Sequence, residues 1–130
     1  ALTLERSHEY CSAILDAIES NQPYRFNGNV RNHGVIANLP ANAVVEVPCL
    51  VDGTGIHPCY VGDLPAELAG LNRTNLNVQE VAVEALKQGD RELVHRAILL
   101  DPLTAAVCSL DETRAMVDEL FEAHAAILTF

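Results

Sequence analysis

A single segment of the chain carries an unambiguous β-strand pattern, residues 43–51 (AVVEVPCLV). Every second side chain in it is apolar and falls on one face, namely Val45, Val47, Cys49 and Val51. Pro48 cannot donate a ladder hydrogen bond, so the pattern predicts an edge strand or a bulged one. Residues 52–55 (DGTG) form a turn pattern, and residues 56–61 (IHPCYV) are the expected returning strand.

Helical spacing of apolar residues is found on both sides of this hairpin pattern. Before it, residues 3–20 predict a helix with Thr3 as its N-cap, followed by short extended pieces joined by irregular backbone over residues 24–39. After residue 64 we expect four helices: one ending at Gly89, one capped by Asp90, a short one opened by Asp101-Pro102, and one starting at the Ser109–Glu112 capping box. The fold class is therefore α+β, mainly helical with a small antiparallel sheet, as a single domain over residues 1–130.

The charge of the chain excludes some partners. Its net charge is −10, from 18 acidic and 8 basic residues. Proteins that bind nucleic acid need a basic surface that displaces phosphate counterions, so nucleic acid and anionic membranes are poor partners. The sequence has no uninterrupted apolar run of roughly 18 residues and no signal-peptide pattern, which predicts neither a membrane span nor export.

Cysteine and histidine are not arranged as metal ligands. The cysteines have no Cys-x-x-Cys pair, which predicts buried, reduced thiols: Cys11, Cys49, Cys59 and Cys108. Two histidines are isolated, and two fall on predicted helices as ordinary surface or boundary residues: His8 and His57, then His95 and His124. We therefore predict no metal site, and the absence of a Gly-x-Gly-x-x-Gly loop predicts no dinucleotide site in these residues.

Residues 28–48 (GNVRNHGVIANLPANAVVEVP) gather polar side chains in backbone rich in glycine and proline. Amides and a guanidinium on such loops commonly bind hydroxyl-rich ligands. The alternative, which local chemistry alone favours, is that the asparagines satisfy their own turns. Glu46, between apolar neighbours, is either solvent-facing or buried in a pair with Arg31.

The same segment resembles the C-terminal region of family 4 glycoside hydrolases. The likeness extends over nearly the whole chain, from Ser7-x-Glu9-Tyr10 onward. Its motifs are NHGVIANLP (32–40), VEVP (45–48), VDGTGIHP (51–58), VGDLP (61–65), NLNVQ (75–79) and DPLTAA (101–106). The DPLTAA stretch and the asparagine loop look more like the α-galactosidase branch than the 6-phospho-glycosidase branch.

The resemblance implies a redox-elimination glycosidase whose substrate is an α-galactoside or α-glucoside. In that family, bound NAD⁺ takes hydride from C3 of the sugar, a tyrosine removes the C2 proton, and Mn²⁺ stabilises the enediolate. The family's NAD loop, metal ligands and tyrosine belong to a preceding part of the enzyme, so catalytic residues, NAD and Mn²⁺ are not expected on this chain. What the resemblance carries over is substrate binding by Arg31, Asn32, His33 and Gly34, with Gly34 permitting close backbone approach.

The resemblance also implies a C-terminal domain of a larger protein, a cytoplasmic location and a homo-oligomer. Two alternatives stay open. One is a non-catalytic structural or oligomerisation module, and the other is the C-terminal domain of a lactate/malate-type dehydrogenase, whose architecture is shared. The VEVP and DPLTAA motifs are not associated with those dehydrogenases, which counts against the second alternative.

Overall fold

The computed structural model describes residues 9–128. The chain divides into two compact units, residues 1–64 and residues 65–130, and each is described by itself. The first unit contains a helix and a sheet, and the second is helical. The expected α+β fold, mainly helical with a small antiparallel sheet, is thus confirmed, whereas the single domain over residues 1–130 stays a prediction.

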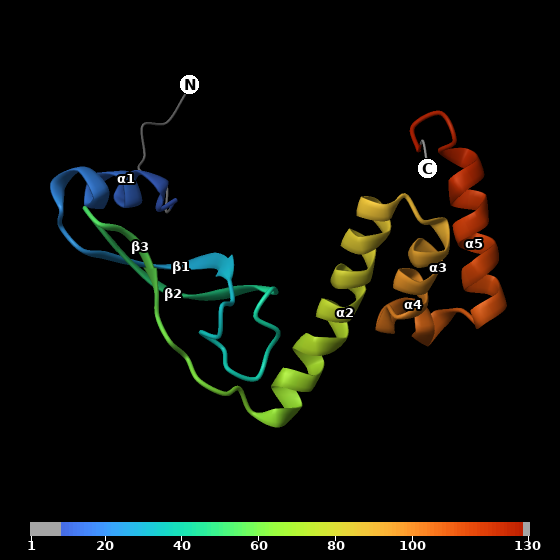
Figure 1. Cartoon of the computed structure of the whole chain (residues 1–130), viewed down its shortest axis with the longest axis horizontal. Coiled ribbons are helices and arrows are strands. Elements are labelled where there is room, and N and C mark those ends of the chain that lie inside the picture. The colour runs from blue at the N-terminus through green and yellow to red at the C-terminus, as the bar shows by residue number, and fades with distance from the viewer. Residues whose placement is uncertain (1–8, 129–130) are drawn as a thin grey trace, which may run out of the picture. The chain divides into compact units, whose positions relative to one another are not determined.

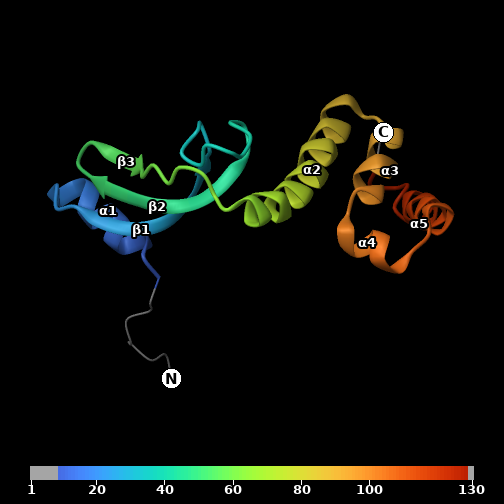
Figure 2. The same cartoon turned by 90° about the horizontal axis from the view of Figure 1, so that it is seen from below.

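The first unit contains an antiparallel sheet of strand order β1-β2-β3 within the described residues (Figure 2). Its strands are β1 (Tyr24–Arg31), β2 (Val44–Asp52) and β3 (Gly55–Pro58). β1 pairs with β2 in continuous register, from Tyr24 opposite Val51 to Arg31 opposite Val44. The prediction of short extended pieces and irregular backbone over residues 24–39 was therefore wrong for its first half, which is one regular strand.

β2 is the central strand, so the prediction of an edge strand was wrong. The reason lies in where the missing N–H of Pro48 points. The Pro48 carbonyl accepts a hydrogen bond from the Cys59 N–H at 2.8 Å, on the β3 side, and the N–H and C=O of one strand residue point to the same side. An N–H at position 48 would therefore point toward β3 and away from β1. Because β3 ends at Pro58, position 48 lies just beyond the paired residues of β2 and β3, and the missing N–H leaves the pairing of β2 with β1 unaffected.

The predicted apolar face of β2 is buried, which confirms its alternation. Cys49 and Val51 have no exposed surface, and Val47 is almost as deeply buried. α1 (Cys11–Ser20) contacts β2 and β1 and contributes the buried Ala17 (Figure 1). Glu9 and Tyr10 precede the helix, so it starts later than predicted, and the proposed N-cap Thr3 lies outside the described residues.

The second unit contains four helices within the described residues, as predicted. They are α2 (Ala66–Gln88), α3 (Arg91–Leu99), α4 (Pro102–Val107) and α5 (Leu110–Ala123). The predicted ends are confirmed: Gly89 ends α2 with a left-handed φ of 63°, Asp90 and Asp101 accept backbone N–H bonds at the starts of α3 and α4, and Ser109 forms a capping box with Glu112. Caps are local in sequence, which is why they could be predicted.

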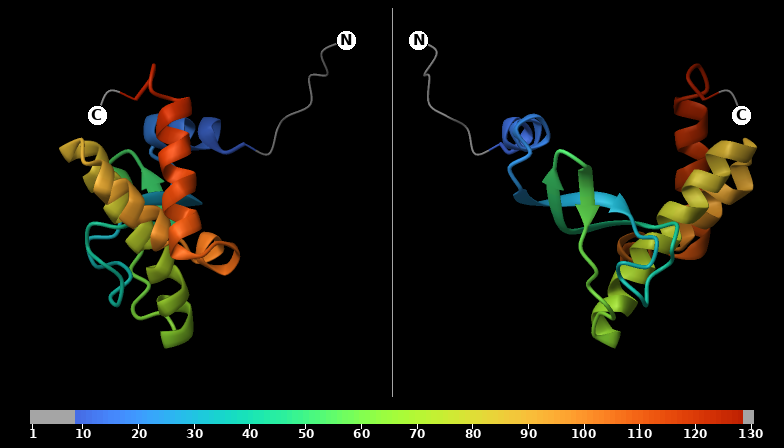
Figure 3. Two further views of the ribbon diagram at one scale, coloured as in Figure 1. Left: turned by 90° about the vertical axis from the view of Figure 1, so that its right-hand side faces the viewer. Right: turned by 60° about the vertical axis from the view of Figure 1, so that its left-hand side comes forward.

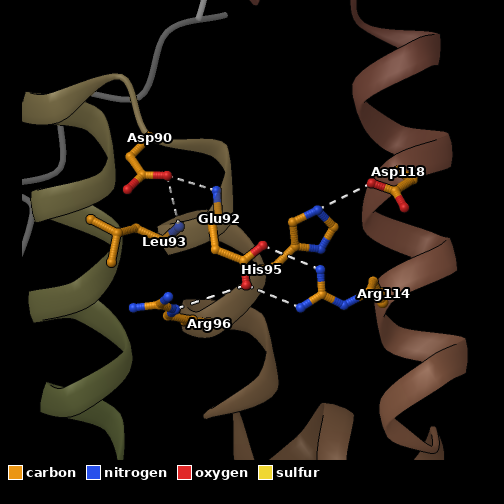
Figure 4. Close-up of polar contacts among 7 residues, drawn as sticks. All are labelled: Asp90, Glu92, Leu93, His95, Arg96, Arg114 and Asp118. Atoms are coloured by element: carbon orange, nitrogen blue, oxygen red, sulfur yellow. Dashed lines mark hydrogen bonds and ion pairs between the residues drawn. The ribbon is translucent and has the colours of Figure 1, made fainter.

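α3 and α5 lie against each other and are joined by polar contacts (Figure 4). Arg114 donates two hydrogen bonds to the Glu92 carboxylate, at 3.0 and 3.2 Å. His95 is buried, with Nε2 3.1 Å from Asp118 Oδ1, and its Nδ1 has no hydrogen-bond partner among the described residues. The prediction that His95 is a surface or boundary residue was therefore wrong, because its face of α3 is covered by α5.

Among the helices in residues 9–128, none is both long and apolar enough to cross a bilayer.

The capping box makes the helical unit sensitive to acid. The backbone N–H and the hydroxyl of Ser109 both donate to the Glu112 carboxylate at 2.8 Å and lower its pKa below the ordinary value of 4.5. A pKa that is lower in the folded state stabilises that state fully above the unfolded value, and the contribution disappears as the pH falls through the folded value. Glu112→Gln keeps an accepting oxygen but cannot titrate, so the melting temperature of the helical unit should fall less on acidification than that of the unaltered chain.

Far-ultraviolet circular dichroism between about pH 6 and pH 3 measures this difference. Glu119→Gln, at an exposed position later in α5, is the control and should melt with the pH dependence of the unaltered chain. An identical pH dependence in Glu112→Gln and the unaltered chain would contradict the assignment.

Candidate functional site

The candidate site is the loop that joins β1 to β2, residues 32–43, which leaves the end of the sheet as a broad excursion (Figures 1 and 3). Asn32 is at its centre and has no exposed surface. Its Nδ2 lies 2.9–3.0 Å from the carbonyl oxygens of Ile36, Leu39 and Pro40, and its Oδ1 accepts from the Ile36 N–H at 2.8 Å. The alternative that the asparagines satisfy their own turns is confirmed for Asn32.

The backbone beside Asn32 is left-handed. His33 has φ 42° and Gly34 has φ 90°. A left-handed conformation costs a residue with a Cβ about 1–2 kcal/mol, so His33 is held there by its surroundings, including the bond from its N–H to the Ala41 carbonyl at 3.0 Å. Apart from its two chain neighbours, no residue has an atom within 4 Å of where a Cβ of residue 34 would lie, so glycine is required there by conformation, and the space beside its backbone is open.

A second asparagine ties the loop to a distant part of the same unit. Asn38 Nδ2 donates to the Leu64 carbonyl at 2.8 Å, and the Leu64 N–H donates to Asn38 Oδ1 at 3.0 Å. Beside this pair, Ile36 and Gly62 form a parallel bridge. Asn38 belongs to the NHGVIANLP motif, but the sequence carries no signal of its contact with Leu64, 26 residues away.

Arg31 and His33 are the exposed members of the predicted site, and Gly34 is half-buried. Arg31 closes β1 opposite Val44, and Glu46 lies on the same sheet face opposite Asn29. Glu46 is exposed, which selects the solvent-facing alternative over the buried pair with Arg31. The structure therefore leaves Arg31 exposed at the end of β1, His33 exposed and Gly34 half-buried at the start of the loop, and Asn32 buried inside it.

The turn between β2 and β3 holds a second polar cluster. The Thr54 hydroxyl lies 2.7 Å from His57 Nε2, and it also donates to Asp52. That hydroxyl bond, together with the Thr54 backbone N–H, lowers the pKa of Asp52. All three bonds are internal to the hairpin, so the cluster has a structural role in closing the turn.

All four cysteines are free thiols, as predicted, but the prediction of burial holds only for Cys49. Burial raises the pKa of its thiol, which makes Cys49 a poor nucleophile near neutral pH. Cys11 and Cys59 are exposed, and Cys108 is half-buried. In the described part of the chain, no three histidine, cysteine or acidic side chains gather closely enough to hold a metal ion.

The loop can therefore offer a ligand a guanidinium, an imidazole and accessible backbone on a framework fixed by two amides. Such donors suit hydroxyl or phosphate oxygens. The described residues themselves offer no cluster that could hold a metal ion.

Comparison with known proteins places this fold and loop in a family. Residues 1–104 match the model of the family 4 glycosyl hydrolase C-terminal domain, and the chain belongs to this family. It is 50% identical to the α-galactosidase of Bacillus subtilis (strain 168) and 43% identical to that of Rhizobium meliloti (strain 1021), each over 95% of this chain. Relatives named as phospho-glucosidases are 29–38% identical.

Solved structures share the fold. Crystal structures of a 6-phospho-α-glucosidase from gut microorganisms, one with NAD and Mn²⁺ and one with NAD and glucose-6-phosphate, superpose with TM-scores of 0.76 and 0.78 at 25% identity. They cover 88% and 89% of this chain, and 26% of their own. The chain likewise spans 28% and 25% of the two α-galactosidases. The family match supports neither the dehydrogenase alternative nor a function outside the glycosidases.

The strain at His33 makes a testable prediction about stability. Asparagine adopts the left-handed region more easily than histidine, so His33→Asn should stabilise the first unit by about 0.5–1 kcal/mol, a fraction of the left-handed penalty. All three tyrosines lie in residues 1–64, so tyrosine fluorescence during urea unfolding reports this unit. His33→Ala, which removes the imidazole but keeps a Cβ in the same conformation, is the control and should bring no gain. Equal stability of the two variants would show that backbone strain is not what His33 contributes.

Proposed function

We propose that this chain is the C-terminal, substrate-side domain of a family 4 glycosidase that hydrolyses α-galactosides. The observation that carries the proposal is the family match together with the identities to two α-galactosidases, which exceed those to the phospho-glucosidase relatives. Hydrolysis of α-glucosides is the alternative that the family resemblance left open, and hydrolysis of 6-phospho-glucosides is the second candidate, since several relatives carry names of the latter kind.

NAD and Mn²⁺ are the cofactors proposed for the whole enzyme. Support comes from two solved family structures with which this chain shares its fold, one with NAD and Mn²⁺ and one with NAD. The described residues of this chain do not fit a metal site of their own, so the residues that hold both cofactors are proposed to lie in the remaining part of the enzyme. The contribution of this domain is then to bind and orient the sugar.

Within the domain, we assign substrate binding to the loop after β1. Arg31 can donate several hydrogen bonds in one plane, and His33 adds a donor or an acceptor at the exposed rim. Open space beside Gly34 allows a sugar to approach the backbone. Asn32 was predicted as a fourth contact, and because its amide is already bonded to the loop, we assign its contribution to the shape of the site.

Self-association and a cytoplasmic location are also part of the proposal. A set of exposed apolar side chains between the end of α3 and the start of α5 supports self-association, because exposed apolar patches commonly mark contacts between chains. It consists of Leu100, Leu103, Val107 and Leu110, three of which are at least 73% exposed. Four free thiols are the state expected in a reducing compartment, which supports the cytoplasm. Both statements stay predictions.

A domain exchange tests the function. The segment of the Bacillus subtilis α-galactosidase that matches this chain over 123 residues is replaced by this chain. With NAD⁺ and Mn²⁺ supplied, the chimera should hydrolyse p-nitrophenyl α-galactoside. The double variant Arg31→Ala/His33→Ala in the same chimera should raise KM by roughly tenfold or more, the loss expected for one to two hydrogen bonds to a bound ligand.

The isolated 130-residue chain is the negative control, since the cofactor residues are proposed to lie elsewhere. Expression of a folded, NAD-binding chimera that hydrolyses only 6-phospho-glucosides would replace the proposed substrate by the second candidate. A folded chimera inactive on all of these glycosides would support the structural-module alternative.

A further inference from the structure

We propose that Asn32 and Asn38 are positioning residues, which hold residues 33–38 in one conformation so that Arg31 and His33 meet a glycoside on a preformed surface. The inference rests on the function proposed above for this loop. It assigns two different roles: the side-chain amides of Asn32 and Asn38 fix the backbone, and the neighbouring side chains contact the sugar.

Asn32 fixes the loop from inside. Its amide joins the backbone of Ile36, early in the loop, to that of Leu39 and Pro40, later in it, with bonds of 2.8–3.0 Å. Because the side chain has no exposed surface, water cannot replace these partners if the amide is lost. These bonds therefore connect the early and the late part of the loop through the side chain of Asn32.

Asn38 fixes the loop from outside. Its side chain is exposed and could bond to water without cost, yet both of its polar atoms bond to the backbone of Leu64. The side-chain amide thereby acts as one more peptide group in a short ladder, in which the Val61 N–H donates to the Val35 carbonyl at 2.7 Å and the Ala37 N–H donates to the Gly62 carbonyl at 2.9 Å. The loop is thus attached to residues 61–64 along its middle.

The strained backbone of His33 explains why a fixed loop conformation matters for binding. A left-handed histidine persists only where the surrounding structure imposes it. A loosened loop would let His33 relax, and the apparent affinity for a ligand falls in proportion to the fraction of molecules that keep the binding conformation. A loss of positioning therefore raises the measured Kd for the ligand, whereas the loss of a purely structural bond elsewhere would leave that Kd unchanged.

Amide hydrogen exchange of the full chain, followed by NMR, tests the contact between Asn38 and Leu64 in the variant Asn38→Ala. This exposed substitution should leave the fold intact, so the amides of β2 should keep their protection. We expect the amides of Ile36, Val61 and Gly62, none of which bonds to Asn38, to exchange at least about tenfold faster because the ladder loosens as a unit. Faster exchange at Leu64 alone would overturn the proposal, since Asn38 would then hold one bond and not the loop.

Asn29→Ala is the matched control, because Asn29 is an exposed asparagine on the adjoining strand β1. It should change none of these rates. The variant Asn32→Asp tests the bonds of Asn32 inside the loop. It keeps an acceptor for the Ile36 N–H but places an oxygen, in place of the NH₂ group, toward three carbonyl oxygens. It should raise the exchange rates of the loop amides at least as much as Asn38→Ala does. Unchanged loop protection in Asn32→Asp would overturn the inner part of the proposal.

Titration with methyl α-galactoside separates this inference from the proposed function. In the unaltered chain the sugar should shift the amide signals of Arg31, His33 and Gly34, and in Asn38→Ala the Kd should rise in step with the lost protection. An unchanged Kd in a variant with a loosened loop would overturn the positioning role. No shift in the unaltered chain would overturn the proposed sugar site, while the exchange rates would still decide whether the two amides hold the loop.

Discussion

A buried side-chain amide costs about 1–3 kcal/mol for each polar group that it leaves without a partner. Asn32 meets that requirement within its own loop, because it has no exposed surface and takes its partners from the backbone of residues 36–40. The conformation of the loop between β1 and β2 depends on this arrangement. Ile36 and Leu39 are buried beside Asn32, and His33 next to it is held in a left-handed conformation.

The two units are stabilised by different means, which fits different roles. In the first, the apolar face of β2 is covered by α1, and an irregular loop at the end of the sheet displays Arg31 and His33. In the second, each of α3, α4 and α5 begins at a capping side chain, and α3 and α5 are joined by Glu92–Arg114 and His95–Asp118 (Figure 4). The first unit carries the candidate chemistry, and the second carries the exposed apolar side chains of α4 and its neighbouring helix ends.

Features of the fold that depend on neighbours in sequence could be predicted from it. The alternation of β2 and the caps Asp90, Asp101 and Ser109 involve contacts within a few residues. Features that depend on distant partners could not. Pro48 indicated an edge strand because the sequence does not show that β3 ends at Pro58, and His95 looked like a boundary residue because nothing local shows that α5 covers it.

The candidate site shows the same difference between features set by sequence neighbours, which could be predicted, and features set by distant partners, which could not. Composition identified the loop, and the family resemblance identified Arg31, Asn32, His33 and Gly34. Neither could separate the residue that shapes the loop from those at its rim, because burial of Asn32 depends on carbonyls up to eight residues away. The contact of Asn38 with Leu64 depends on a segment 26 residues away and was not predicted.

The exchange rate of the Asn32 side-chain NH₂ protons, measured by NMR on the unaltered chain, tests the central claim most directly. Exposed asparagine amides such as that of Asn29 provide the internal reference. The account predicts that the Asn32 protons exchange orders of magnitude more slowly than the reference, since each opening must break a buried set of bonds. Exchange at the rate of the exposed amides would contradict it, because the loop would then have no fixed centre.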